Sequence, residues 1–141
     1  STPSIYKKVI QLEDKGYIKS NTVKEGKMAE KAVYTLTDEG EKRFEKLMLE
    51  TASKPIRMFL DFNAVIVNLD SLTPEEQRVC LTNIENNVKA LKIYMEENIR
   101  LKEPVLDIPK TGMAVLHQQY LLAGAIENWI VSLRESFDDQ K

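Results

Sequence analysis

The spacing of apolar residues predicts a helix at the start of the chain. Its apolar positions recur three to four residues apart along one face: Ile5, Val9 and Leu12. Thr2 can cap the free N–H groups of the first turn, and Pro3 suits the first helical position because it has no N–H. Gly16 ends the pattern, since glycine adopts the left-handed conformation of a helix terminus at little cost. We therefore predict a helix over residues 2–15.

The segment that follows alternates between apolar and polar side chains, as a β-strand does. Two such stretches, residues 17–23 and 32–37, flank a turn in which Gly26 can adopt a positive φ. We predict a β-hairpin over residues 17–37. Its tip would display three lysines: Lys24, Lys27 and Lys31.

Further helical segments follow the hairpin. Thr37 is a cap for the first of them, and Thr73 with Glu76 forms a capping box that begins a long helix. Prolines and polar residues separate the four predicted helices, which cover about residues 38–54, 56–69, 74–102 and 110–137. The segment 56–69 is strongly apolar, and we expect it to be more buried than the helix before it.

The last predicted helix is apolar on two sides. One stripe consists of Met113, Leu116, Tyr120, Ala123, Ile126, Ile130 and Leu133. The other consists of Val115, Leu122, Ala125 and Trp129. A helix of this kind packs against two surfaces at once. We expect the second surface to belong to another copy of the chain.

Charge is distributed unevenly over the 141 residues. The formal net charge is −2, but residues 1–36 hold seven lysines against four acidic residues. The remaining residues hold 13 basic and 18 acidic groups. A mildly basic first segment on an acidic body weakly favours a nucleic-acid contact at that end.

The sequence offers little for catalysis. It has no glycine-rich phosphate loop, no arrangement typical of a catalytic triad and no metal-ligand spacing, so we expect neither an enzyme nor a bound metal or cofactor. Cys80 is the single cysteine, which suits a cytoplasmic protein without disulfides. No stretch of 18 apolar residues predicts a membrane span.

The order helix, hairpin, helix is the most informative pattern. It is the second half of a winged helix-turn-helix, in which the first helix reads base edges in the major groove. The hairpin is then the wing, whose basic tip contacts phosphates or the adjacent minor groove. The fold class that we predict is mostly α with one two-stranded β-hairpin: a partial winged helix at residues 1–50 and a helical dimerisation domain at 51–141.

Several short motifs resemble the PadR family of bacterial transcriptional regulators. They are Ser4-Ile-Tyr6, Leu12-Glu13, Gly16-Tyr-Ile18 and Tyr34-Thr-Leu-Thr-Asp-Glu-Gly40. The resemblance covers residues 1 to about 48, and the later helices are loosely similar to the helical domain of longer family members. It implies a homodimeric repressor that binds double-stranded operator DNA, with paired C-terminal helices and release by a small aromatic or hydrophobic effector.

The resemblance also suggests site residues. Candidate DNA contacts on the helix and the wing are Ser1, Thr2, Ser4, Tyr6, Lys7, Lys8, Lys24, Lys27 and Lys31. A candidate effector pocket would use Tyr94, His117, Tyr120 and Trp129, although aromatic residues at helical spacing are more often core. The family has two further helices before this point. We therefore expect that the native protein is longer or that this chain cannot bind DNA as it stands.

Two other hypotheses remain open on the sequence. One is a helical homodimeric interaction protein with a vestigial wing, and the other is a ligand-sensing module without DNA binding. Salt dependence separates them from a regulator, because affinity that rests on phosphate contacts falls steeply as salt rises.

Overall fold

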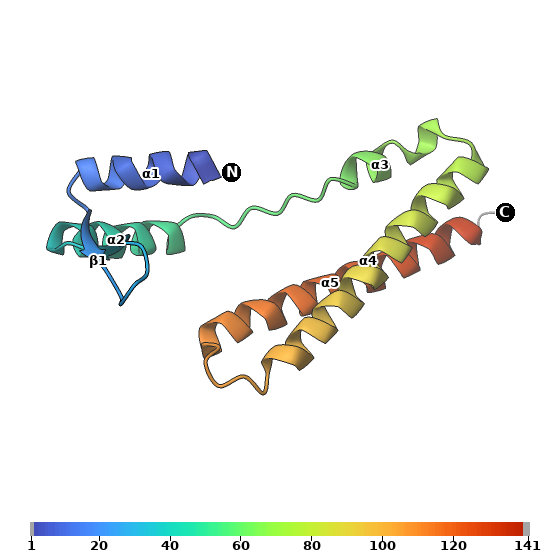
Figure 1. Ribbon diagram of the computed structural model, residues 1–141. Coiled ribbons are helices and arrows are strands. Elements are labelled where there is room, and N and C mark those ends of the chain that lie inside the picture. Colours follow the sequence, from blue (N-terminus) through green and yellow to red (C-terminus); the bar gives the residue numbers. More distant parts are fainter. Residues whose placement is uncertain (1, 140–141) are drawn as a thin grey trace. The chain divides into compact units, whose positions relative to one another are not determined.

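The structure, a computed structural model, describes residues 2–139 of the chain. They are mostly helical, with one two-stranded antiparallel sheet, so the predicted fold class is confirmed (Figure 1). The elements in order are α1 (Thr2–Asp14), β1 (Ile18–Val23), β2 (Lys31–Leu36), α2 (Asp38–Ala52), α3 (Asn63–Val67), the 3-10 helix η1 (Leu69–Ser71), α4 (Pro74–Lys102) and α5 (Lys110–Asp138).

The chain divides into two compact units, Ser1–Met58 and Phe59–Lys141. The first contains α1, the hairpin and α2, and the second contains α3, η1, α4 and α5. The domain boundary expected after residue 50 falls within the last turn of α2. The two units are described separately below.

Gly16 ends α1 as the sequence predicts. It has a φ of +78°, its N–H donates to the carbonyl of Glu13, and the N–H of Tyr17 donates to the carbonyl of Leu12. These two hydrogen bonds form a Schellman motif, which pairs carbonyls that the helix end would otherwise leave without donors. The chain leaves the motif directly into β1.

The wing is a regular antiparallel ladder in which Ile18 pairs with Leu36 and Val23 with Lys31. Gly26 in the connecting turn has a φ of +58°, which confirms the predicted positive value. Because side chains alternate across a strand, the hairpin has two distinct faces. Leu36 lies on the face toward α2, since its Cδ2 approaches the Cβ position of Gly40 at 3.2 Å.

Thr37 joins three elements of the first unit. Its side-chain hydroxyl accepts a hydrogen bond from the N–H of Gly40 at 3.1 Å and so caps α2. The same hydroxyl donates to the carbonyl of Gly16 at 2.5 Å. Its backbone N–H donates to the carbonyl of Tyr17 at 3.1 Å. The end of α1, the end of the wing and the start of α2 therefore meet at one residue.

Gly40 permits this junction because it has no side chain. A Cβ atom built on it would lie 1.9 Å from the carbonyl oxygen of Tyr17, far inside van der Waals contact. Gly40 is also the one buried residue among the described residues of the first unit. The absence of a side chain at this position lets α2 lie against the backbone of Tyr17, which immediately precedes β1.

The apolar face of α1 has little cover in the described residues. Ile5 is 65% exposed and Leu12 is 42% exposed, whereas Val9 is half-buried. Phe44 and Met48 on α2 are also exposed. Apolar packing within the described residues of the first unit therefore restrains α1 only weakly.

The helix predicted over residues 56–69 is wrong for most of that range. Residues 55–60 have no regular secondary structure, and Ile56 and Phe59 are 92% and 85% exposed. Helix α3 covers only Asn63–Val67. A dense apolar run indicates burial but does not select a helix, and a short helix forms only where its face packs on a surface. Side chains of this segment pack against the core of the second unit at Phe62, Val65 and Ile66, where the short helix forms.

The second unit is an antiparallel hairpin of α4 and α5 (Figure 1), with α3 and η1 packed against its core. Its buried core consists of Leu69, Leu81, Ile84, Val88, Ala123 and Ile130. The capping box predicted for Thr73 and Glu76 is present, and its hydrogen bonds lower the pKa of Glu76 below the usual value. The end of α4 and both ends of α5 also lie within one or two residues of their predicted positions.

Only part of the apolar surface of α4 is buried. Val79 and Leu91 are 54% and 43% exposed, whereas Leu81, Ile84 and Val88 lie in the core. The helix carries two overlapping sets of apolar residues, and only the set that contacts α5 is buried. The register between α4 and α5 decides which of these two sets is turned toward the partner helix.

Charged pairs across the helix hairpin are consistent with one register. Arg134 of α5 donates to the buried carboxylate of Glu85 on α4. Two turns further along α4, Lys92 lies 3.6 Å from Glu127, which is two turns back along α5. A shift by one residue would separate both pairs.

We predict that Gly40→Ala destabilises the first unit by about 2 kcal/mol, because its Cβ meets a backbone carbonyl and the helix must move. The gain in helix propensity, at most about 1 kcal/mol, does not offset this clash. Gly112→Ala in α5 is the control, since its Cβ would meet open space and should leave stability equal or higher. Urea unfolding followed by circular dichroism measures both. Equal stability of the two variants would contradict the prediction.

We predict that Arg134→Met lowers the free energy of unfolding of the second unit by about 2–3 kcal/mol, because the buried Glu85 carboxylate loses its guanidinium partner. Lys46→Met removes an exposed pair with Glu50 and should cost less than about 0.5 kcal/mol. During urea unfolding, fluorescence of Trp129 reports on the second unit and measures Arg134→Met, while circular dichroism also follows the helices of the first unit and measures Lys46→Met. Adding Glu85→Gln to Arg134→Met should recover part of the loss, and no recovery would argue against this explanation.

Candidate nucleic-acid interface

Helix α1 presents one continuous polar stripe. At 3.6 residues per turn, Ser4 and Lys8 share a face with Gln11 and Lys15, and all four are exposed. Lys7 lies beside this stripe, while the apolar residues lie on the other side of the helix. The stripe therefore gives the helix a face that can meet a groove and its phosphates.

The predicted contacts on α1 do not all share this face. Tyr6 is 64% exposed but lies roughly opposite Lys8 around the helix axis. Ser1 lies outside the described residues, and for Thr2 only the backbone, within α1, is described. Gln11 and Lys15 were missed as candidates, although their spacing from Ser4 in the sequence could have found them.

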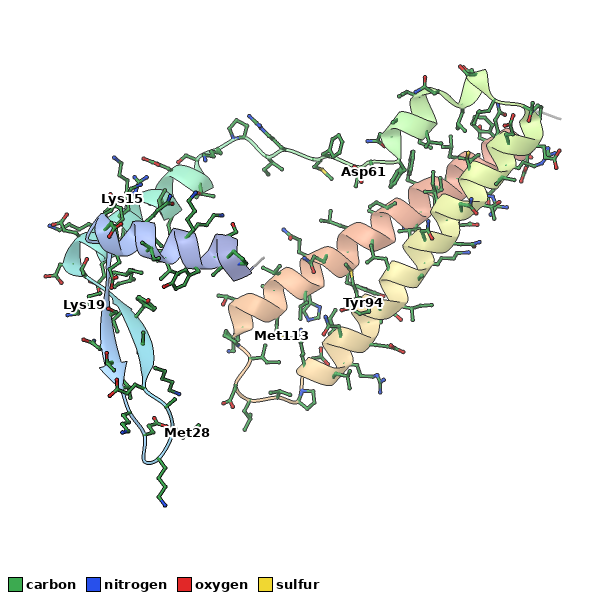
Figure 2. All side chains as sticks on the ribbon, turned by 45° about the horizontal axis from the view of Figure 1, so that its top comes forward. Lys15, Lys19, Met28, Asp61, Tyr94 and Met113 are labelled. Carbon is green, nitrogen blue, oxygen red and sulfur yellow. The ribbon has the colours of Figure 1, made fainter. Side chains whose placement is uncertain are left out.

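The wing places its lysines at the tip and along one face. Lys24 and Lys27 lie in or beside the turn, and Lys31 begins β2; all are exposed. Lys19 lies on the same face as Lys31, because Lys19 pairs with Thr35 and Val23 pairs with Lys31. This face points away from the Leu36 side that contacts α2. Figure 2 shows Lys19 near the base of the wing and Met28 near its tip.

The lysines of α1 and the wing make no ion pair among the residues that the structure describes. The ion pairs found in the first unit both lie within α2, between Lys42 and Glu39 and between Lys46 and Glu50. The cationic side chains of the helix and wing are thus available to an external anion. Lys19, which alternation along β1 could have identified, adds to this set.

The four residues of the candidate effector pocket lie on the second unit, and the structure brings only two of them together. His117 and Tyr120 line a hollow of about 270 Å³ with Glu96, Ile99, Arg100 and Glu103. The hydroxyl of Tyr120 donates to Glu96 at 2.9 Å, and this hydrogen bond raises the pKa of the phenol. His117 Nε2 lies 3.9 Å from a carboxylate oxygen of Glu103.

The other two aromatic residues lie elsewhere. Trp129 stacks on Phe62 with a ring distance of 5.7 Å. Tyr94 is 65% exposed and does not line the hollow.

Within residues 2–139 no group of His, Cys, Asp and Glu is arranged to hold a metal ion. None of the described helices is long and apolar enough to cross a membrane.

A helix with a polar face, a two-stranded wing with basic residues and a capped following helix define the winged-helix class of DNA-binding fold. Residues 1–46 match the sequence profile of the Transcriptional regulator PadR-like family. No curated protein is similar enough to the sequence to count as a match.

Several solved structures are similar in fold to this chain over nearly its whole length. PadR of Bacillus subtilis in complex with operator DNA has a TM-score of 0.81 at 23% identity, covering 96% of this chain and 78% of that one. The same protein in complex with p-coumaric acid has a TM-score of 0.80 at 21% identity, covering 98% and 79%. The virulence activator AphA of Vibrio cholerae has a TM-score of 0.67 at 14% identity, covering 100% and 80%.

At these identities the structural matches show the fold of the chain and no more. The match to the PadR-like family covers residues 1–46 of the 141, so it describes the first unit and leaves the rest of the chain without a family match.

Proposed function

We propose that the protein controls transcription by binding operator DNA as a homodimer, with α1 in the major groove and the wing on the neighbouring backbone. The observation that carries this proposal is the first unit itself: a polar helix face and a basic wing face on elements joined at Thr37, within residues that match the PadR-like family. The complex of Bacillus subtilis PadR with operator DNA, which has the same fold, supports it.

The polar face of α1 would read bases, and the wing would bind phosphates. Ser4, Lys7 and Lys8 lie near the N-terminal end of α1, the part of a recognition helix that contacts base edges. Lys24, Lys27 and Lys31 are exposed at the tip and along one face of a hairpin, a suitable place for contacts to the DNA backbone. Tyr6, on another side of the helix, would contact a flanking phosphate or sugar.

Dimerisation would use the second apolar stripe of α5. Its members Val115, Leu122 and Trp129 are 52%, 44% and 39% exposed, whereas Ala123 and Ile130 of the first stripe are buried. Exposed apolar side chains at helical spacing on one face mark a surface for another chain. A second copy would bring two recognition helices to one DNA duplex.

We further propose that the protein represses transcription in the cytoplasm, has no catalytic activity and is released from DNA by a small aromatic or hydrophobic effector. The p-coumaric acid complex of Bacillus subtilis PadR supports an effector of this class. Since AphA is a virulence activator with the same fold, a reporter gene in a deletion strain must decide the direction of control. Rising expression on deletion supports repression, and falling expression supports activation.

We predict that Lys24→Ala with Lys27→Ala in the native protein weakens binding to all DNA sequences alike. Phosphate contacts carry no sequence information, and each one lost should reduce the slope of log affinity against log salt by about 1. Fluorescence anisotropy over a salt series measures both effects, with Lys42→Ala and Lys46→Ala on α2 as control. A loss restricted to one sequence would show that the wing reads bases instead.

We predict that Leu122→Glu weakens dimerisation about 100-fold or more, because each copy would bury an unpaired charge at the interface. Leu106→Glu, in the loop between α4 and α5, replaces a residue that is 99% exposed and should leave the dimer intact. Sedimentation at micromolar concentration distinguishes the two states. A wild-type monomer under these conditions would refute the proposed dimer.

A further inference from the structure

We infer that Thr37 is a positioning residue for DNA recognition: its hydroxyl fixes the recognition helix relative to the wing and thereby sets sequence specificity. This inference rests on the proposed function. It goes further by assigning sequence specificity to a residue at the junction of the wing and α2, which would contact no base.

The side-chain oxygen of Thr37 makes two hydrogen bonds of opposite sense. It donates to the carbonyl of Gly16, two residues after the end of α1, at 2.5 Å, and it accepts from the N–H of Gly40 at 3.1 Å. The first bond joins residues 21 positions apart in the sequence. The second caps α2.

The Schellman motif leaves the carbonyl of Gly16 facing out of α1. The N–H of Gly16 donates to the carbonyl of Glu13, and the N–H of Tyr17 donates to the carbonyl of Leu12. The next carbonyl, that of Tyr17, accepts from the backbone N–H of Thr37 at 3.1 Å. Thr37, at the end of the wing, therefore holds the carbonyls of Gly16 and Tyr17 in the short segment between α1 and β1.

Few other described contacts hold α1 in place. Its residues Ile5, Ile10 and Leu12 are 65%, 39% and 42% exposed, so apolar packing within the described unit restrains it only weakly. The hydrogen bonds at Thr37 and the close approach of Gly40 to Tyr17 are the rigid connection. Loss of the Thr37–Gly16 bond would let α1 pivot relative to the wing.

Such a pivot would affect specific binding more than total affinity. Base-edge hydrogen bonds require placement to within about half an ångström, whereas lysine side chains can follow a phosphate over a longer distance. The quantity to measure is therefore the ratio of affinities for a specific and an unrelated duplex.

Three substitutions of Thr37 separate the two hydrogen bonds. Thr37→Ser keeps both, because serine has the same hydroxyl group. Thr37→Asp keeps the cap on α2, since aspartate is a strong N-cap, but its carboxylate cannot donate to the Gly16 carbonyl. Thr37→Val loses both bonds. Circular dichroism and the unfolding midpoint report on the cap independently of DNA.

The probe is a duplex that the wild-type protein enriches from a random-sequence pool, compared with a shuffled duplex of the same composition. We expect Thr37→Ser to keep the affinity ratio within about twofold, and Thr37→Asp and Thr37→Val to lower it about three- to tenfold, the effect of one hydrogen bond. The salt slope should not change, because the phosphate contacts remain.

An unchanged ratio in folded Thr37→Asp would overturn the inference while leaving the proposed function standing. A ratio in Thr37→Ser as low as in Thr37→Asp would also overturn it, because the hydroxyl would then not be the cause. If the wild-type protein enriches no duplex from the pool, the proposed function fails and this inference falls with it.

Discussion

The close contact between the start of α2 and the segment that joins α1 to β1 is the constraint on which the first unit depends. Gly40 lies against the carbonyl of Tyr17, and Thr37 holds the carbonyls of Gly16 and Tyr17. Helix α1, the hairpin and α2 have no extensive common core in the described residues. Their arrangement depends instead on the side-chain and backbone hydrogen bonds of Thr37 and on Gly40, which has no side chain.

The second unit depends on a different physical balance. Its core is apolar, and interhelical polar pairs such as Glu85 with Arg134 and Lys92 with Glu127 select the register of α4 and α5. That register decides which apolar stripe of each helix is buried. The stripe of α5 that remains exposed is the surface that we assign to a second copy of the chain.

Elements whose boundaries are set by local signals could be predicted from the sequence. Elements whose formation or burial depends on tertiary packing could not. Gly16, Gly26 and the caps at Thr37 and Thr73 each act within a few residues, so the boundaries they predict agree with the structure. The helix predicted over 56–69 failed, because a helix there depends on a surface against which its apolar face can pack. The motif residues carried the family resemblance, but nothing in them revealed that Thr37 bonds to Gly16.

A footprint of the native protein on a duplex that it selects tests the proposed mode of action most directly. Two symmetric copies with a winged helix each should protect two related half-sites, with centres about 10 base pairs apart or a whole multiple of that distance. Protection of the same face of the duplex at that spacing is the predicted result. A single unrepeated site, half-sites on opposite faces or no protection would contradict a dimer that reads successive major grooves with α1.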